Sequence, residues 1–128
     1  MHKLLLLAIL ALTLTNCTKE AGLGGTAQIV GRVRTILYDS DLDSVATYYP
    51  GEQRVYIVFG TDSIYNEDTR TDEDGYYRFK YLNTGKYTLF TYSDCLTCPS
   101  KKKVVKTVID IAQPKQSLNA KELVVKKY

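Results

Sequence analysis

Apolar and polar residues alternate along most of the chain beyond residue 26. In residues 27–38, Ile29 and Val33 fall on one side of an extended strand. Arg32 and Arg34 fall on the other side. This period of two is typical of a β-strand with one buried face. It predicts strands at residues 27–38, 54–60, 63–65 (or onward toward Arg70), 76–82, 86–92, 103–111 and 119–127. No stretch has helical spacing, so we predict an all-β domain, an antiparallel β-sandwich of about seven strands.

The alternation also predicts which side chains form the core. Residues 54–60 are apolar almost throughout, which favours a central strand of a sheet. Elsewhere every second residue is expected to face inward. The predicted inward residues are Ile29, Gly31, Val33, Thr35, Leu37, Val55, Ile57, Phe59, Tyr77, Phe79, Tyr87, Leu89, Val105, Thr107, Ile109, Ile111, Leu123 and Val125.

Three connections between these strands carry information. The sequence Asn83-Thr84-Gly85 predicts a short hairpin turn between residues 76–82 and 86–92. Residues 39–53 and 93–102 predict two longer loops. Long loops in compact domains often carry function, so binding residues are expected there.

The N-terminus has the composition of a signal peptide. A basic start is followed by eleven apolar or small residues at 4–14, whereas a membrane span needs about 20. The following Leu14-Thr15-Asn16-Cys17 resembles the lipobox of bacterial lipoproteins, with Asn16 in place of the usual Gly, Ala or Ser. We predict a signal peptide over residues 1–16, a lipidated Cys17 with a flexible tether over 17–26, and a sandwich domain over 27–128. The alternative is an ordinary secretory peptide that leaves Cys17 as a free thiol.

Charge is balanced overall and unevenly distributed. Without Lys3, the chain has sixteen basic and fourteen acidic residues, which is too small an excess to indicate nucleic acid binding. Residues 39–74 hold ten acidic and two basic residues, and residues 75–128 hold three acidic and eleven basic ones. Such a charge dipole is typical of solvated faces.

Glycines, aromatic residues and leucines recur at fixed spacing through the predicted strands. The pattern reads Gly31-x-Val33, Val55-x-Ile57 and Thr71-x-x-Asp74-Gly75-x-Tyr77-x-Phe79-x-x-Leu82-x-x-Gly85-x-Tyr87-x-Leu89. It resembles the carboxypeptidase regulatory-like domain over residues 27–127, most strongly over 71–89. The resemblance implies a transthyretin-like (prealbumin-like) sandwich and the envelope of a Bacteroidetes-type lipoprotein, with an outer-membrane location. Because the shared positions are structural, it implies no catalytic residue.

Several classes of chemistry are excluded by composition. The only histidine is His2, inside the predicted signal peptide. The mature chain therefore lacks Ser–His and Cys–His nucleophiles and histidine metal ligands. We predict that the protein is not an enzyme and has no cofactor.

Cys95 and Cys98 form the one closely spaced cysteine pair. Zinc needs four ligands, and no second pair exists. A thioredoxin-like site needs the pair at the start of a helix, whereas here Pro99 and three lysines lead into a strand. In an oxidising envelope we predict a disulfide that braces the loop.

Aspartates cluster in the predicted loops. If seven strands run up and down, the loops at residues 39–53, 71–75 and 93–102 gather at the end opposite the tether. That rim would hold weak candidates for a cation such as Ca²⁺, although the pattern is not that of an EF-hand. These candidates are Asp39, Asp41, Asp43, Asp72 and Asp74. The alternative is that they are solvated, turn-forming aspartates.

Tyrosines also fall near this rim. Tyr48, Tyr49, Tyr92 and Asp94 are the candidate partner-binding residues. We predict a lipid-anchored, non-enzymatic envelope module that is structural or binds a protein or glycan partner. The alternative is a calcium- or carbohydrate-binding accessory lipoprotein of an uptake system.

Overall fold

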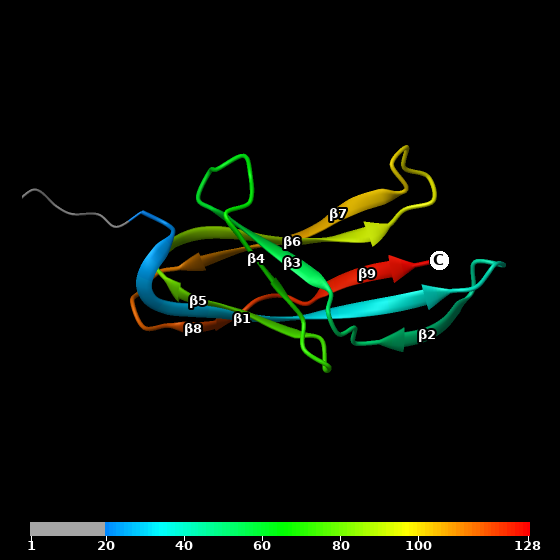
Figure 1. Cartoon of the computed structure of the whole chain (residues 1–128), viewed down its shortest axis with the longest axis horizontal. Helices are drawn as coiled ribbons and strands as arrows, with labels where there is room; N and C mark the ends of the chain where they lie inside the picture. Colours follow the sequence, from blue (N-terminus) through cyan, green and yellow to red (C-terminus); the bar gives the residue numbers. More distant parts are fainter. Residues whose placement is uncertain (1–19) are drawn as a thin grey trace, which may run out of the picture.

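The computed structural model describes residues 20–128 as two β-sheets that face each other (Figure 1). Strands occupy most of this part of the chain, and it contains no helix, so none is long and apolar enough to cross a membrane. The strands are β1 (Leu23–Tyr38), β2 (Ser44–Tyr48), β3 (Arg54–Phe59), β4 (Glu67–Arg70), β5 (Tyr76–Leu82), β6 (Gly85–Asp94), β7 (Lys102–Ile111), β8 (Ser117–Asn119) and β9 (Leu123–Lys127).

The first sheet is built around β1. β2 and β5 pair with it in antiparallel fashion, and β8 and β9 pair with it in parallel. The second sheet has the order β4-β3-β6-β7 and is antiparallel throughout. The predicted all-β sandwich is confirmed. It has nine strands rather than about seven, and the two parallel pairings at β1 were not expected. Residues 63–65 form no strand, and the third predicted strand lies further along the chain as β4.

The core lies between the two sheets and follows the predicted alternation. Along β1, Ile29, Val33 and Thr35 are each at most 3% exposed. β3 and β6 place Ile57 and Leu89 opposite them, both fully buried. Full burial of such a side chain stabilises the fold by about 1.5–3 kcal/mol. β3 is a central strand between β4 and β6, as its apolar sequence predicted.

Two predicted boundaries are wrong. The first strand begins earlier than residue 27, because β1 starts at Leu23, and the N–H of Gly22 is already bonded to the buried Tyr87. Residues 23–26 therefore belong to the sheet and not to a tether. The predicted loop at 39–53 contains β2, which pairs with the end of β1 although its side chains are exposed. An edge strand of this kind leaves no apolar run in the sequence.

The predicted hairpin at residues 83–85 is also wrong. β5 pairs with β1, whereas β6 pairs with β3 and β7, so the chain crosses from one sheet to the other at this point. Alternation looks the same for two strands that pair in one sheet and for two that face each other across a core. Gly85 is required because a Cβ there would lie 2.7 Å from that of Ala21.

The Tyr87 hydroxyl fastens this crossing to the start of β1. It accepts the N–H of Gly22 at 2.9 Å and donates to the carbonyl of Asn83 at 2.7 Å. The Asn83 N–H in turn donates to the carbonyl of Gly22 at 2.8 Å. Within residues 20–128, the equally buried hydroxyl of Tyr77 has no hydrogen-bond partner. Burial raises the pKa of both phenols, so both stay neutral.

We expect Tyr77→Phe and Tyr87→Phe to change stability in opposite directions. Removing the unbonded hydroxyl of Tyr77 should raise the free energy of unfolding by about 1 kcal/mol, because an unsatisfied buried polar group is costly. Removing the bonded hydroxyl of Tyr87 should lower it by about 1–3 kcal/mol, because Gly22 and Asn83 lose their partner. Urea unfolding of the two variants beside wild type measures both changes. An equal loss of unfolding free energy in both variants would contradict the difference between the bonded and the unbonded hydroxyl group.

Candidate functional site

One hollow of the described chain opens between the two sheets at the end remote from residue 20. We call it the distal groove. It has a volume of about 530 Å³ and is lined from β1, β2, β6, β7, β9 and residues 49–53. In Figure 1 this is the right-hand end, where β9 runs between β6 above and β1 below.

The floor of the distal groove is a row of side chains across three strands. Thr35 of β1 is paired with Tyr48 of β2 on one side and with Val125 of β9 on the other. Residues directly opposite in neighbouring strands place their side chains on the same face. Thr35 and Val125 are buried, and Tyr48 at the edge is 38% exposed. The floor therefore consists of two buried side chains, with an accessible aromatic ring at its margin.

The inner wall is the segment that carries the chain from β2 to β3. Gln53 donates its side-chain N–H to the Thr91 hydroxyl at 2.8 Å, which ties this segment to β6. The Gln53 backbone N–H donates to the Thr71 hydroxyl at 2.9 Å, and that hydroxyl donates to the carbonyl of Pro50 at 2.6 Å. These bonds hold the wall in place, and the exposed part of the Gln53 amide adds hydrogen-bonding capacity.

Asp94 stands on the opposite wall, at the end of β6. Its carboxylate forms an ion pair with Lys102 and accepts the N–H of Tyr128 at 3.2 Å. The hydrogen bond from Lys102 lowers the pKa of Asp94 against the opposing effect of burial, with further help from Tyr128, Lys102 and Lys127. The carboxylate is therefore ionised at neutral pH, as an acceptor of hydrogen bonds.

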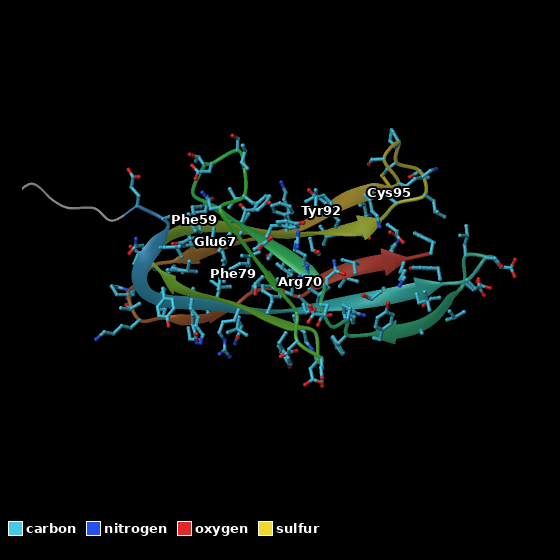
Figure 2. The ribbon with its side chains drawn as sticks, in the orientation of Figure 1. Phe59, Glu67, Arg70, Phe79, Tyr92 and Cys95 are labelled. Atoms are coloured by element: carbon cyan, nitrogen blue, oxygen red, sulfur yellow. A yellow bond between two sulfur atoms is a disulfide. The ribbon has the colours of Figure 1, made fainter. Side chains whose placement is uncertain are left out.

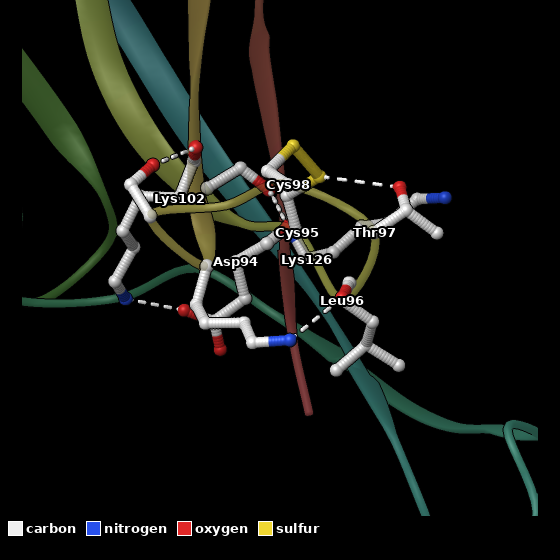
Figure 3. The surroundings of a disulfide bond; sticks show 10 residues. Asp94, Cys95, Leu96, Thr97, Cys98, Lys102 and Lys126 are labelled. Carbon is white, nitrogen blue, oxygen red and sulfur yellow. Dashed lines mark hydrogen bonds and ion pairs between the residues drawn. A yellow bond between two sulfur atoms is a disulfide. The ribbon is translucent and has the colours of Figure 1, made fainter.

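The predicted disulfide between Cys95 and Cys98 is formed, with the Cα atoms 5.4 Å apart (Figure 3). It lies at the tip of the β6–β7 hairpin. The N–H of Cys95 donates to the carbonyl of Lys101 at 2.9 Å, and the Lys101 ammonium donates to the carbonyl of Leu96 at 3.1 Å. The braced tip holds Asp94 and Lys102 opposite each other at the base of the hairpin.

Tyr92 joins the groove to a row of aromatic rings on the outer face of the second sheet. It lies edge-on to Phe90 and Tyr56, with ring centroids 5.8 and 5.7 Å away. Tyr56 also stacks on Phe90 at 4.9 Å and contacts Tyr65 at 4.7 Å. Tyr92, which Figure 2 labels, remains 47% exposed. Its ring thus packs against two aromatic neighbours and stays accessible at the mouth of the groove.

The four predicted partner-binding residues, Tyr48, Tyr49, Tyr92 and Asp94, all line the distal groove. Tyr49 offers the least ring surface to a ligand in the groove, because the Arg32 guanidinium carbon lies 3.2 Å from its ring centroid, on the outer face of the first sheet. Their role in binding remains a prediction. Sequence reasoning missed Gln53 and Lys127, which are polar residues at strand ends with no distinguishing spacing.

The predicted acidic rim does not form. The N–H of Val33 donates to the carbonyl of Gly75, so the turn at 71–75 lies beside the middle of β1, whereas Asp39 follows the last residue of that strand. Asp72 accepts the N–H groups of Asp74 and Tyr76, and Asp39 accepts those of Asp41 and Asp43. These aspartates shape turns, as the alternative predicted. Across residues 20–128, no three His, Cys, Asp or Glu side chains gather around a possible metal ion.

Cys17, the predicted lipid attachment site, lies outside the described residues.

Comparison with known proteins adds little beyond this geometry. No family model matches the chain. No curated protein matches it either. Among solved structures, it is similar to the crystal structure of a candidate carbohydrate-binding protein from Pseudomonas aeruginosa, with 12% sequence identity and a TM-score of 0.49. The match covers 84% of this chain and 92% of that one. A likeness at this level does not extend to function.

We expect Asp94→Asn to reduce the amount by which the free energy of unfolding falls at acid pH. The folded state lowers the pKa of Asp94, so this group stabilises the fold above its unfolded pKa of about 3.9. That contribution is lost as the pH falls through the lower folded pKa. Urea unfolding between pH 6 and about pH 2.5 should therefore show a smaller loss of stability for the variant than for wild type. Identical pH profiles would show that the ion pair with Lys102 has no effect on stability.

Proposed function

We propose that this protein is a non-enzymatic binding module that holds a saccharide in the distal groove. One observation carries the proposal: the distal groove is lined by accessible tyrosine rings and also by the amide of Gln53, the carboxylate of Asp94 and lysine ammonium groups. Its volume of about 530 Å³ lies in the range of small-ligand sites. All of these groups belong to the chain itself, so the proposal needs no calcium ion.

The chemistry of sugars matches this lining. A pyranose ring has apolar C–H faces and a rim of hydroxyl groups, so it needs both flat apolar surface and hydrogen-bonding partners. Tyr48 and Tyr92 offer ring surface with a polar tip, and they are 38% and 47% exposed. Gln53 and Asp94 supply a donor and an acceptor on opposite walls.

The same residues argue against catalysis. Asp94 is the one carboxylate of the groove lining, and hydrolysis of a glycoside ordinarily requires two. Its pKa is lowered, whereas a general acid needs a raised one. A group fixed in an ion pair with Lys102 is suited to orienting a ligand.

We further propose that Cys17 carries a lipid and that the domain belongs to the carboxypeptidase regulatory-like group of envelope lipoproteins. The sequence Leu14-Thr15-Asn16-Cys17 supports the anchor. The described chain begins at the end of the sandwich opposite the distal groove (Figure 1). An anchor at that end would leave the groove facing away from the membrane.

We expect Tyr48→Ala and Tyr92→Ala each to weaken saccharide binding about tenfold, because each removes a ring face from the mouth of the groove. Wild-type protein is first screened on an array of bacterial and host glycans. Affinities for the best ligand are then measured by titration calorimetry.

Tyr81→Ala is the matched control, since Tyr81 is 70% exposed and lies outside the groove lining. It should bind like wild type. Equal losses in all three variants would point to a general effect on folding. A wild-type protein that binds no glycan would overturn the proposal and favour a protein partner on the outer aromatic row.

We expect the protein from native-host membranes to carry an acylated Cys17 at its N-terminus, and Cys17→Ala to be released into the soluble fraction. Several acyl chains, each CH₂ contributing about 0.8 kcal/mol, hold a protein firmly on a bilayer. Mass spectrometry of the membrane and soluble fractions shows whether Cys17 is acylated and where each protein is found. An unmodified wild-type chain in the soluble fraction would exclude the anchor.

A further inference from the structure

The lining of the distal groove carries an excess of positive charge. It includes three lysines, Lys102, Lys126 and Lys127, against the single carboxylate of Asp94. A neutral sugar would need none of these charges. What matters for a ligand is which of the ammonium groups remains available to it.

Two of the three lysines are already engaged. Lys102 is ion-paired with Asp94, so these two charges largely cancel. The side chain of Lys126 points to the face of the first sheet opposite that of Val125 and Lys127. On this outer face its ammonium lies 5.5 Å from the ring centroid of Tyr38. Neither lysine presents an uncompensated charge to the hollow.

Lys127 is placed differently. It is paired with Leu37 of β1 and follows the buried Val125 by two residues, so its side chain leaves β9 on the groove side. Within residues 20–128 it takes part in no ion pair. Its charge is nevertheless near Asp94, since it helps to lower the pKa of that carboxyl. The bonds of Asp94 go to Lys102 and to the N–H of Tyr128, so in the described part of the chain the Lys127 ammonium at the groove has no ion-pair partner.

We propose that the distal groove selects acidic saccharides, and that Lys127 binds the carboxylate of a uronic acid unit. This inference rests on the proposed function, because it specifies the ligand of the same groove. Tyr48 and Tyr92 contact the sugar faces, Gln53 and Asp94 bond hydroxyl groups, and Lys127 supplies the opposite charge. A carboxylate–ammonium hydrogen bond is stronger than a neutral one, so it discriminates between otherwise identical sugars.

The experiment uses pairs of oligosaccharides that differ only in charge. Oligomers of galacturonate, mannuronate, guluronate and glucuronate are each compared with their carboxyl-reduced neutral counterparts by titration calorimetry at low salt. We expect at least one uronate oligomer to bind about threefold to tenfold more tightly than its neutral counterpart. The difference should shrink in 0.5 M NaCl, because ions screen an exposed pair.

Lys127→Gln should remove this preference, so that the ratio of the affinities for the uronate oligomer and its neutral counterpart falls to about one. The matched control is Lys121→Gln, which alters the net charge equally at an exposed residue outside the groove lining and should keep the preference. Equal binding of charged and neutral oligomers would overturn the acidic selectivity and leave saccharide binding standing. A preference that survives in Lys127→Gln would overturn the role of Lys127. If neither form of any oligomer or other glycan binds, the proposed function and this inference fall together.

Discussion

The register along β1 is the constraint on which the rest of the structure depends. β1 runs over Leu23–Tyr38 and pairs with every other strand of its sheet: β2, β5, β8 and β9. A shift of one residue would turn Ile29, Val33 and Thr35 out of the core and bring Arg32 and Arg34 into it. The burial of apolar side chains on one face of β1 therefore fixes the position of four strands at once.

The distal groove is a consequence of this arrangement. Thr35 lies between Tyr48 and Val125 because the last part of β1 is paired on both edges. β9 then continues toward β6, where the N–H of Lys126 donates to the Ser93 hydroxyl at 2.8 Å and that of Tyr128 to Asp94. The parallel addition of β9 thus brings the two sheets together on one side of the groove. It also brings Lys127 near Asp94.

The hairpin tip has a separate role in the same site. The disulfide between Cys95 and Cys98 limits the conformations of a short exposed turn, and Asp94 and Lys102 stand at its base. A pair of exposed charges at a strand end contributes little to stability by itself. Here its main effect is to hold one carboxylate ionised and oriented. Within residues 20–128, Lys127 is the lysine on the groove side of β9 that takes part in no ion pair.

The sequence by itself determined which side of the long strands is buried and which cysteines pair, because both depend on residues close together in the chain. It predicted the inward faces at Ile29, Ile57 and Leu89, and it selected Tyr48, Tyr49, Tyr92 and Asp94 as residues near one site. Only the tertiary structure decided which strands are neighbours. Alternation has the same period whatever the partner, so it could not reveal that β5 and β6 lie in different sheets or that β9 pairs with β1. For the same reason, the position of the 71–75 turn beside Val33 and the bond from the Tyr128 N–H to Asp94 depend on contacts between distant parts of the chain.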